Sequence, residues 1–226
     1  MHDFGLRTDD LKSAAEPTDG PFVDRLQTLA AGHGLTIVAG MFEAIPGDDR
    51  IYNTAVVVDP RRGLTTKYRK RHLYDAFGDK ESERFRPGDE DPPLIDLQGF
   101  AVALAICYDL RFPDFIGRLA DAGADLLVLP AAWVAGPLKE EHWSVLTRTR
   151  AIDNTMYVAG AAQTGATYCG RAVIVDPLGV VVAGLGEAEG FAVAQISRER
   201  LQAARARLPL LAQRRAAREG VARLAR

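Results

Sequence analysis

The sequence predicts an α/β fold organised around a strand that is buried on both faces of a sheet. The central observation is the unbroken apolar run of residues 100–106, which follows Gly99 and ends at Cys107. Segments with the apolar spacing of helices alternate with further short apolar runs along the chain. Two parts of the chain also repeat the order helix, strand and hairpin, which indicates a duplicated architecture.

The composition excludes several broad classes of protein. With 226 residues, 47% of them hydrophobic, the chain can bury the core of one domain or at most two small ones. A net charge of −2 provides no basic field for nucleic acid, and no apolar run approaches the ~20 residues that span a membrane. Two cysteines do not make a disulfide framework, which favours the reducing cytoplasm. The polar opening residues 1–11 match neither a signal peptide nor a transit peptide.

The first half of the chain predicts one helix, three strands and one long loop. The helix begins at the turn Asp19-Gly20-Pro21, and Gly32-His33-Gly34 ends it. A turn at residues 60–63 joins the last two strands in a hairpin. The polar loop after this hairpin is of a length that is usually functional or disordered. The predicted strands are 35–40, 52–59 and 64–69, and the loop is 74–93.

The second half predicts further strands and helices, followed by an arginine-rich tail. The predicted helices are 115–123 and 141–154, and the strands are 125–130, 156–161, 171–175, 180–185 and 191–196. A helix begins at about Arg198, and residues 198–226 hold nine arginines and two glutamates. Because this tail has leucines but no aromatic residue, we expect it to pack on the domain or on a second subunit rather than to bind nucleic acid.

The duplication also indicates a gap at the start of the chain. A strand ending at Gly40 matches one ending at Gly160, and each is followed by a hairpin with Asp-Pro and Gly in its turn. In the second half this unit is preceded by strand, helix and strand over residues 100–130. The equivalent of the second of these strands would fall near residues 5–10, which are too polar to be buried. We therefore expect the first half to lack its opening strand–helix–strand.

Three residues are candidates for chemistry. Cys107 ends a buried strand, where α/β sheets place reactive groups, although most unpaired cysteines are apolar core residues. Lys70 ends its own strand in a cluster of cations; it could favour a cysteine thiolate and stabilise an oxyanion, or belong to a solvated basic turn. Glu81, in the long loop between them, could supply a carboxylate or be an exposed acid.

A series of short motifs occurs in order along the chain: YNT (52–54), YRKRHL (68–73), KES (80–82), RPGDE (86–90), ICYDLRFP (106–113), DLLVLPAAW (125–133), HW (142–143), RAIDN (150–154) and VDPLG (175–179). Together they resemble the carbon–nitrogen hydrolase (nitrilase) superfamily, near its omega-amidase-like branch, over almost the whole chain. The resemblance implies an α-β-β-α sandwich of two similar halves. It also implies hydrolysis of non-peptide C–N bonds by a Glu-Lys-Cys triad, without metal or organic cofactor.

Carried over position by position, the resemblance implies roles for individual residues. Cys107 resembles the nucleophile, Lys70 the oxyanion-stabilising lysine, and Glu81 a second glutamate that positions the lysine and the substrate. The implied reaction is thiolate attack on an amide carbonyl, loss of ammonia and hydrolysis of the thioester. The implied substrate-binding groups are the backbone N–H of Tyr108, in the oxyanion hole, with Ala132, Trp133 and His142 lining the pocket.

The general base of the family, the glutamate of a Pro-Glu pair, has no counterpart in this sequence. The family segment after that pair resembles residues 1–5, so we expect the base just upstream of Met1. Glu43 follows a strand, but the resemblance places it at a different strand end, which predicts a structural role. Because loss of a general base typically lowers a rate by ~10²–10⁴, residues 1–226 by themselves are expected to be nearly inactive.

Three functions remain open on the sequence alone. The first is a thiol amidase acting on a small aliphatic amide, with residues 1–226 as one N-terminally incomplete domain of a cytoplasmic homodimer. The second is a catalytically inactive remnant or interaction protein that lacks the general base. The third is a nitrilase or an N-carbamoyl hydrolase, because the sequence does not fix which bond is cleaved.

Overall fold

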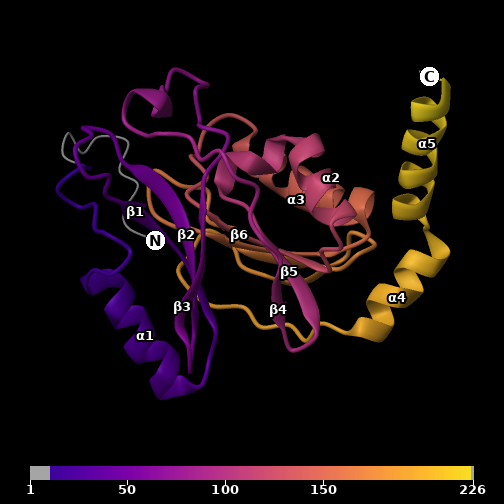
Figure 1. Ribbon diagram of the computed structural model, residues 1–226, viewed down its shortest axis with the longest axis horizontal. Helices are drawn as coiled ribbons and strands as arrows, with labels where there is room; N and C mark the ends of the chain where they lie inside the picture. The colour runs from indigo at the N-terminus through magenta and orange to yellow at the C-terminus, as the bar shows by residue number, and fades with distance from the viewer. Residues whose placement is uncertain (1–10, 225–226) are drawn as a thin grey trace. The chain divides into compact units, whose positions relative to one another are not determined.

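Figure 1 presents a computed structural model, which describes residues 11–224 and the side chains of residues 11–219. The chain divides into two compact units. The first contains the residues up to Pro93 together with Leu104–Asp109 and Pro130–Ala132, and the second contains the remainder. Residues 1–10, where the sequence predicts no buried strand, and residues 225–226 lie outside this description.

The first unit is built on an antiparallel sheet with a helix packed beside it (Figure 1). Helix α1 (Pro21–His33) has proline in its first turn and ends at Gly34, whose left-handed φ of 64° suits glycine. Its buried face carries Val23 and Ala30 against the sheet. The strands lie in the order β1 (Ile37–Glu43), β2 (Tyr52–Asp59) and β3 (Gly63–Arg69). The predicted helix and hairpin are thereby confirmed.

The second unit is built on a six-stranded sheet. Its strands lie in the order β4 (Ile95–Leu97), β5 (Phe100–Leu104), β6 (Leu126–Ala131), β7 (Tyr157–Ala162), β8 (Val173–Val175) and β9 (Val181–Gly184). Helices α2 (Pro113–Asp121) and α3 (Lys139–Asn154) connect strands of this sheet. With a sheet and helices in each unit, the protein has the predicted α/β fold.

The predicted repeat is visible in two hairpins of the same construction. The β2–β3 pair shifts register between Val57 and Val58, and the β8–β9 pair shifts between Ile174 and Val175. Each bulge lies just before an Asp-Pro turn, in which the aspartate side chain accepts two backbone N–H groups. The same turn chemistry therefore closes a hairpin in both halves.

Two strand predictions require correction, and one strand was missed. The sequence predicts a strand over residues 191–196, but the structure assigns them no strand pairing, and Phe191 and Val193 are 87% and 79% exposed. Alternation of apolar residues favours an extended chain, whereas a strand also needs a neighbour for its backbone hydrogen bonds. Strand β4 was not predicted, because three residues are too few for a periodic signal. The predicted strand 100–106 ends earlier, at Leu104.

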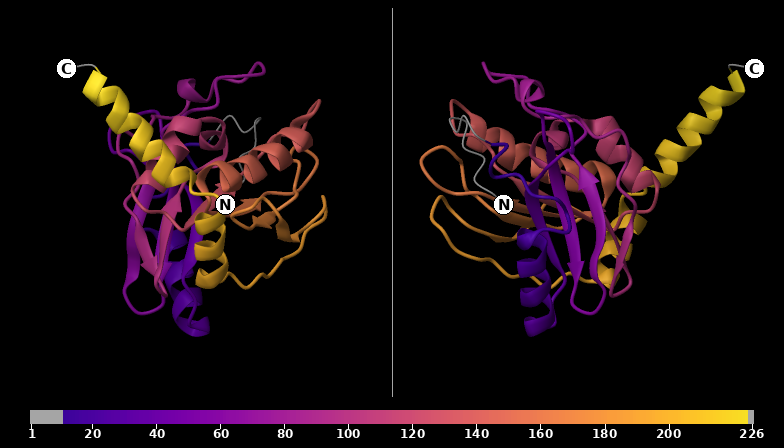
Figure 2. Two further views of the ribbon diagram at one scale, coloured as in Figure 1. Left: turned by 90° about the vertical axis from the view of Figure 1, so that its right-hand side faces the viewer. Right: turned by 60° about the vertical axis from the view of Figure 1, so that its left-hand side comes forward.

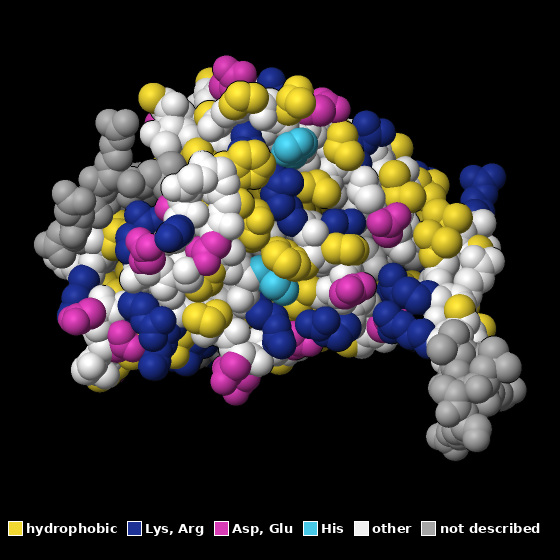
Figure 3. All heavy atoms as spheres, turned by 90° about the horizontal axis from the view of Figure 1, so that it is seen from above, with side chains coloured by type: hydrophobic (Ala, Val, Ile, Leu, Met, Phe, Trp, Pro, Cys, Tyr) yellow, Lys and Arg dark blue, Asp and Glu magenta, His cyan; other side chains and the backbone are white. Residues whose placement is uncertain are grey.

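The arginine-rich tail forms two helices, α4 (Arg198–Arg207) and α5 (Leu210–Leu224), separated at Pro209 (Figure 2). Its arginines pair with carboxylates of the second unit: Arg198 and Arg205 with Asp125, Arg200 with Asp176, and Arg214 and Arg218 with Asp121. On the face drawn in Figure 3, basic and acidic side chains are likewise interspersed. No helix within residues 11–224 is long and apolar enough to cross a bilayer.

A side chain at Gly88 should destabilise the first unit. A Cβ atom there would lie 2.3 Å from the carbonyl oxygen of Arg69, so strand β3 or the following loop would have to shift. We expect Gly88→Ala to lower the free energy of unfolding by about 1–3 kcal/mol in urea denaturation. The control is Gly186→Ala, whose Cβ would meet no atom within 4 Å. Equal losses in the two variants would contradict the clash.

Candidate active site

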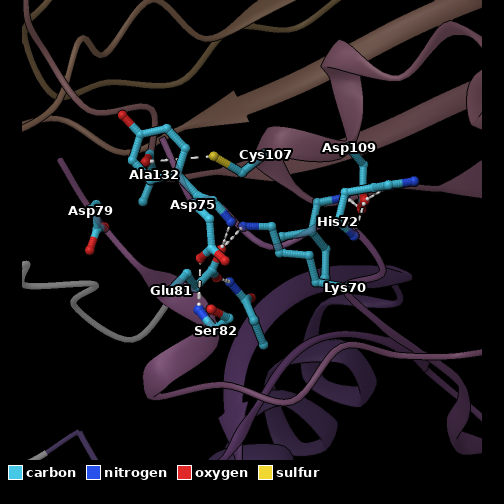
Figure 4. A network of polar contacts seen from close by, with 12 residues as sticks. Lys70, His72, Asp75, Asp79, Glu81, Ser82, Cys107, Asp109 and Ala132 are labelled. Atoms are coloured by element: carbon cyan, nitrogen blue, oxygen red, sulfur yellow. Dashed lines mark hydrogen bonds and ion pairs between the residues drawn. The ribbon is translucent and has the colours of Figure 1, made fainter. Parts of the chain in front are cut away.

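Lys70 and Glu81 form a buried ion pair. Lys70 is the first residue after β3, and its backbone is held on both sides, because its N–H donates to Asn53 and its carbonyl oxygen accepts from Gly88, each at 2.8 Å. The Nζ atom lies 2.5 Å from Glu81 Oε2, and the side chains are 2% and 0% exposed (Figure 4). Two of the three residues predicted to carry chemistry are therefore in direct contact.

Further donors fix Glu81 in place. It opens the 3₁₀ helix η1 (Glu81–Glu83) in the predicted long loop, and it accepts hydrogen bonds from the Tyr74 N–H at 2.5 Å and from Asn53 Nδ2 at 3.3 Å. Burial by itself would lower the pKa of Lys70, but the attraction of the Glu81 carboxylate raises this pKa above its ordinary value. Lys70 is thus a cation at neutral pH, as oxyanion stabilisation requires.

Cys107 follows β5 and opens the 3₁₀ helix η2 (Cys107–Arg111) with a φ of 45°. Non-glycine residues rarely adopt this left-handed conformation, and such strain is concentrated at functional sites. The Sγ atom donates to the carbonyl oxygen of Ala132, 3.7 Å away, just past β6. Burial raises the pKa of the thiol above its ordinary value even though the positive charge of Lys70 opposes the change. At neutral pH the resting side chain is therefore a neutral thiol.

Sequence reasoning missed a third charged group of this network, Asp109. Its carboxylate is fully buried and accepts hydrogen bonds from four groups: Tyr68 Oη, the Ile106 N–H, the His72 N–H and His72 Nδ1. Two signals could have indicated it. The first is that Asp109 lies only two residues after Cys107. The second is that alternation along an extended segment places Tyr68 and His72, its two side-chain partners, on the same side as Lys70.

The residues predicted to bind substrate fall into two groups. Tyr108 and Ala132 belong to the first unit with Lys70, Glu81 and Cys107, and the Tyr108 ring packs edge-on against Tyr74, with 5.1 Å between ring centroids. Trp133 and His142 belong to the second unit.

Within the second unit, Trp133 and His142 meet a common partner. The guanidinium of Arg111 lies 4.7 Å from the Trp133 ring centre, and its Nη2 atom is 3.2 Å from His142 Nδ1. Trp133 Nε1 also donates to the Lys139 carbonyl oxygen at 2.9 Å. The structure thus groups these two predicted residues around an arginine that the sequence reasoning did not single out.

Glu43 has the structural role that the sequence predicts. Its buried carboxylate accepts hydrogen bonds from Thr54, Lys67 and Arg69 at 2.7–2.9 Å. Burial raises the pKa of this carboxyl, but the bonds from Arg69 and Lys67 outweigh burial and lower the pKa to about 2. A carboxylate held in this way is a poor proton acceptor, which argues against a base role for Glu43.

The His, Cys, Asp and Glu side chains of the described residues form no group of three that could hold a metal ion. The polar groups around Cys107 are instead bonded to one another (Figure 4).

Comparison with known proteins identifies the family. The family model of carbon–nitrogen hydrolases matches residues 3–206. The chain belongs to the carbon–nitrogen hydrolase family. This hydrolase is 40% identical over 203 residues to the deaminated glutathione amidase of Escherichia coli O157:H7, a match that covers 89% of this chain and 76% of that protein.

Solved structures agree with this assignment. The hydrolase matches Nit3 of Saccharomyces cerevisiae, a member of branch 10 of the nitrilase superfamily, with a TM-score of 0.78, 31% identity, and coverage of 89% of this chain and 74% of that one. It also matches a CN-hydrolase superfamily protein of Xanthomonas campestris that carries an arsenic adduct in its active site. This second match has a TM-score of 0.81 and 29% identity, and it covers 91% of this chain and 79% of that one. The predicted superfamily is confirmed, and by resemblance the enzyme is an amidase.

Removing the charge of Lys70 should leave the Glu81 carboxylate buried and uncompensated. We expect Lys70→Met to lower the free energy of unfolding by about 3–5 kcal/mol. The double variant K70M/E81Q should recover much of this loss, because neither side chain then carries a charge out of water. Urea denaturation of the two variants measures the difference, and a double variant as unstable as the single one would argue against the ion pair as the cause.

Glu43 should make stability depend on acid pH. Because folding lowers its pKa from 4.5 to about 2, the ionised carboxylate stabilises the fold above about pH 4.5, and this contribution is lost as the pH falls toward 2. Glu43→Gln should therefore flatten the loss of stability over that interval, as measured by urea midpoints at several pH values. The control is Glu83→Gln, at a side chain that is 67% exposed; an identical effect there would contradict the prediction.

Proposed function

We propose that this hydrolase is a thiol amidase that releases ammonia from a small aliphatic amide through a thioester on Cys107. The observation that carries the proposal is the buried Lys70–Glu81 ion pair, whose positive charge opposes the rise that burial causes in the pKa of the Cys107 thiol. A permanent cation beside a strained cysteine suits nucleophilic attack on a carbonyl group. The naming of similar proteins as deaminated glutathione amidases supports an amide substrate.

In the proposed reaction, the Cys107 thiolate attacks the amide carbon while the carbonyl electron pair moves onto oxygen. Lys70 Nζ and the Tyr108 N–H stabilise this oxyanion. Collapse of the intermediate breaks the C–N bond, and the nitrogen takes up a proton and leaves as ammonia. Water then attacks the thioester, which releases the carboxylic acid and restores the thiol. The residues proposed to line the substrate pocket are Ala132, Trp133 and His142.

The thiol must lose its proton before it attacks. Glu81 is already bonded to Lys70, Tyr74 and Asn53, and the Ala132 carbonyl oxygen accepts a hydrogen bond from the thiol without being basic. The proposed mechanism therefore uses a carboxylate base other than Glu81, as the family resemblance implies. A chain without that base would fit the alternative function, an inactive remnant.

We further propose that the chain acts as a single domain of a cytoplasmic homodimer. The family match runs through both units, and Cys107 and Cys169 are unpaired thiols, as in a reducing compartment.

For the dimer, Val145 and Ile152, 50% and 36% exposed on α3, offer apolar surface to a second copy. The extension 198–226 would add to this packing. Light scattering should give twice the chain mass of 24.5 kDa; a monomer mass would refute the dimer.

Ammonia release tests the function directly. We expect purified protein to release ammonia from one or more small aliphatic amides and Cys107→Ser to abolish the release, because the thioester cannot form. Cys169→Ser should retain the activity. Hydrolysis of nitriles or N-carbamoyl amines without amide turnover would favour the third function. Lack of turnover on all three substrate classes would favour the inactive remnant.

Alkylation of Cys107 should follow the raised pKa of its thiol. Since only the thiolate reacts with iodoacetamide, the rate should be low at pH 7 and should rise with pH beyond the range of an ordinary cysteine. Lys70→Met should slow alkylation further, because it removes the cation that favours the thiolate. Mass spectrometry of the Cys107 peptide measures both rates. Alkylation at pH 7 as fast as that of a free thiolate would contradict this view of the resting site.

A further inference from the structure

The buried carboxylate of Asp109 joins the two segments that carry the lysine and the cysteine. Its Oδ2 atom accepts from Tyr68 Oη and from the Ile106 N–H, each at 2.9 Å. Its Oδ1 atom accepts from the His72 N–H at 3.0 Å and from His72 Nδ1 at 2.7 Å. Each of the four hydrogen bonds is within normal length, and the Asp109 side chain is 0% exposed.

The donors flank the two residues proposed to react. Tyr68 and His72 stand two positions before and two positions after Lys70, whereas Ile106 directly precedes Cys107. Asp109 itself lies in η2, the short helix that Cys107 opens. One carboxylate thus connects the end of β3 to the turn that carries the cysteine, and Figure 4 places Lys70 between the Glu81 and Asp109 contacts.

The Glu81 ion pair fixes the Lys70 ammonium to a loop but not to the cysteine. Lysine has a flexible four-carbon stem, and a displacement of about 1 Å in a catalytic group can cost ~10²-fold in rate. The position of Lys70 relative to Cys107 therefore depends on the contacts that join their two backbone segments. The four Asp109 hydrogen bonds make such a link.

We propose that Asp109, with Tyr68 and His72 as its donors, is a positioning group that holds the Lys70 ammonium at its working distance from the Cys107 sulfur. Charge alone does not explain Asp109, because its negative charge helps to keep Lys70 protonated but also disfavours the thiolate of Cys107. The four hydrogen bonds of its carboxylate, which join the two backbone segments, give Asp109 a geometric role that its charge does not supply.

The first test measures catalysis and rests on the proposed amidase function. We expect Asp109→Asn to lower kcat about 10- to 100-fold with little change in KM, because an asparagine side chain satisfies only some of the four donors. His72→Ala should lower kcat by a smaller factor, and His72→Asn should restore most of it, since its amide can donate from near the position of Nδ1. The matched control is Asp125→Asn, at a buried carboxylate of the second unit; it should lower stability while kcat stays unchanged.

The second test needs no substrate and therefore separates the positioning role from the amidase function. A double-mutant cycle compares the effect of Lys70→Met on the rate of Cys107 alkylation in the wild-type and D109N backgrounds. We expect Lys70→Met to slow alkylation several-fold in the wild type and by less than about twofold in D109N, because in D109N the ammonium is no longer held beside the sulfur. The same factor in both backgrounds would overturn the proposal, as would a kcat that falls equally in D109N and D125N. Coupling without turnover of any amide would support the positioning role and refute the amidase.

Discussion

The charge on Lys70 can be buried in this fold only because Glu81 is buried with it. Each ion that leaves water costs several kcal/mol, and a close partner compensates for this only when the remaining hydrogen-bonding groups are also satisfied. Asn53 contributes to both members, since its carbonyl oxygen accepts from the Lys70 N–H and its side chain donates to Glu81. The ion pair and the two Asn53 hydrogen bonds therefore join strand β2, the end of β3 and the long loop. Gly88 approaches the end of β3 closely, and its N–H donates to the carbonyl oxygen of Lys70.

Local pattern was sufficient for most of the fold but not for contacts across it. Apolar periodicity and turn residues located α1, β2 and β3 closely, because those signals arise from neighbouring residues. The failure at residues 191–196 has the opposite cause, since a strand requires a partner that its own sequence does not encode. At the candidate site, strand-end position and family resemblance indicated Cys107, Lys70 and Glu81. The spacing of Asp109 from Cys107 was a local signal, but the bond of Asp109 to Tyr68 joins residues 41 positions apart and cannot be read from local pattern.

The two hairpins share one backbone construction but differ in the side chains at the end of their second strand. Both contain a bulge before an Asp-Pro turn, so the backbone is prepared in the same way. The difference lies in the residues at the end of the second strand of each hairpin. After β3 the chain continues into Lys70 and His72, both bonded to buried carboxylates, whereas β9 ends at the exposed Gly184. The sheet determines where a strand ends, and the side chains placed there determine whether that end can carry chemistry.

A neutral thiol next to a permanent cation also has a consequence for the proposed reaction. Only interactions that are stronger in the transition state than in the ground state accelerate a chemical step. If Lys70 held Cys107 as a thiolate at rest, much of its attraction would already stabilise the ground state before the substrate bound. Burial and the nearby carboxylates instead keep the thiol protonated, while Glu81 keeps the lysine charged. In the proposed reaction, the attraction of Lys70 is then exerted only as negative charge develops, first on the Cys107 sulfur when it loses its proton and then on the substrate oxygen.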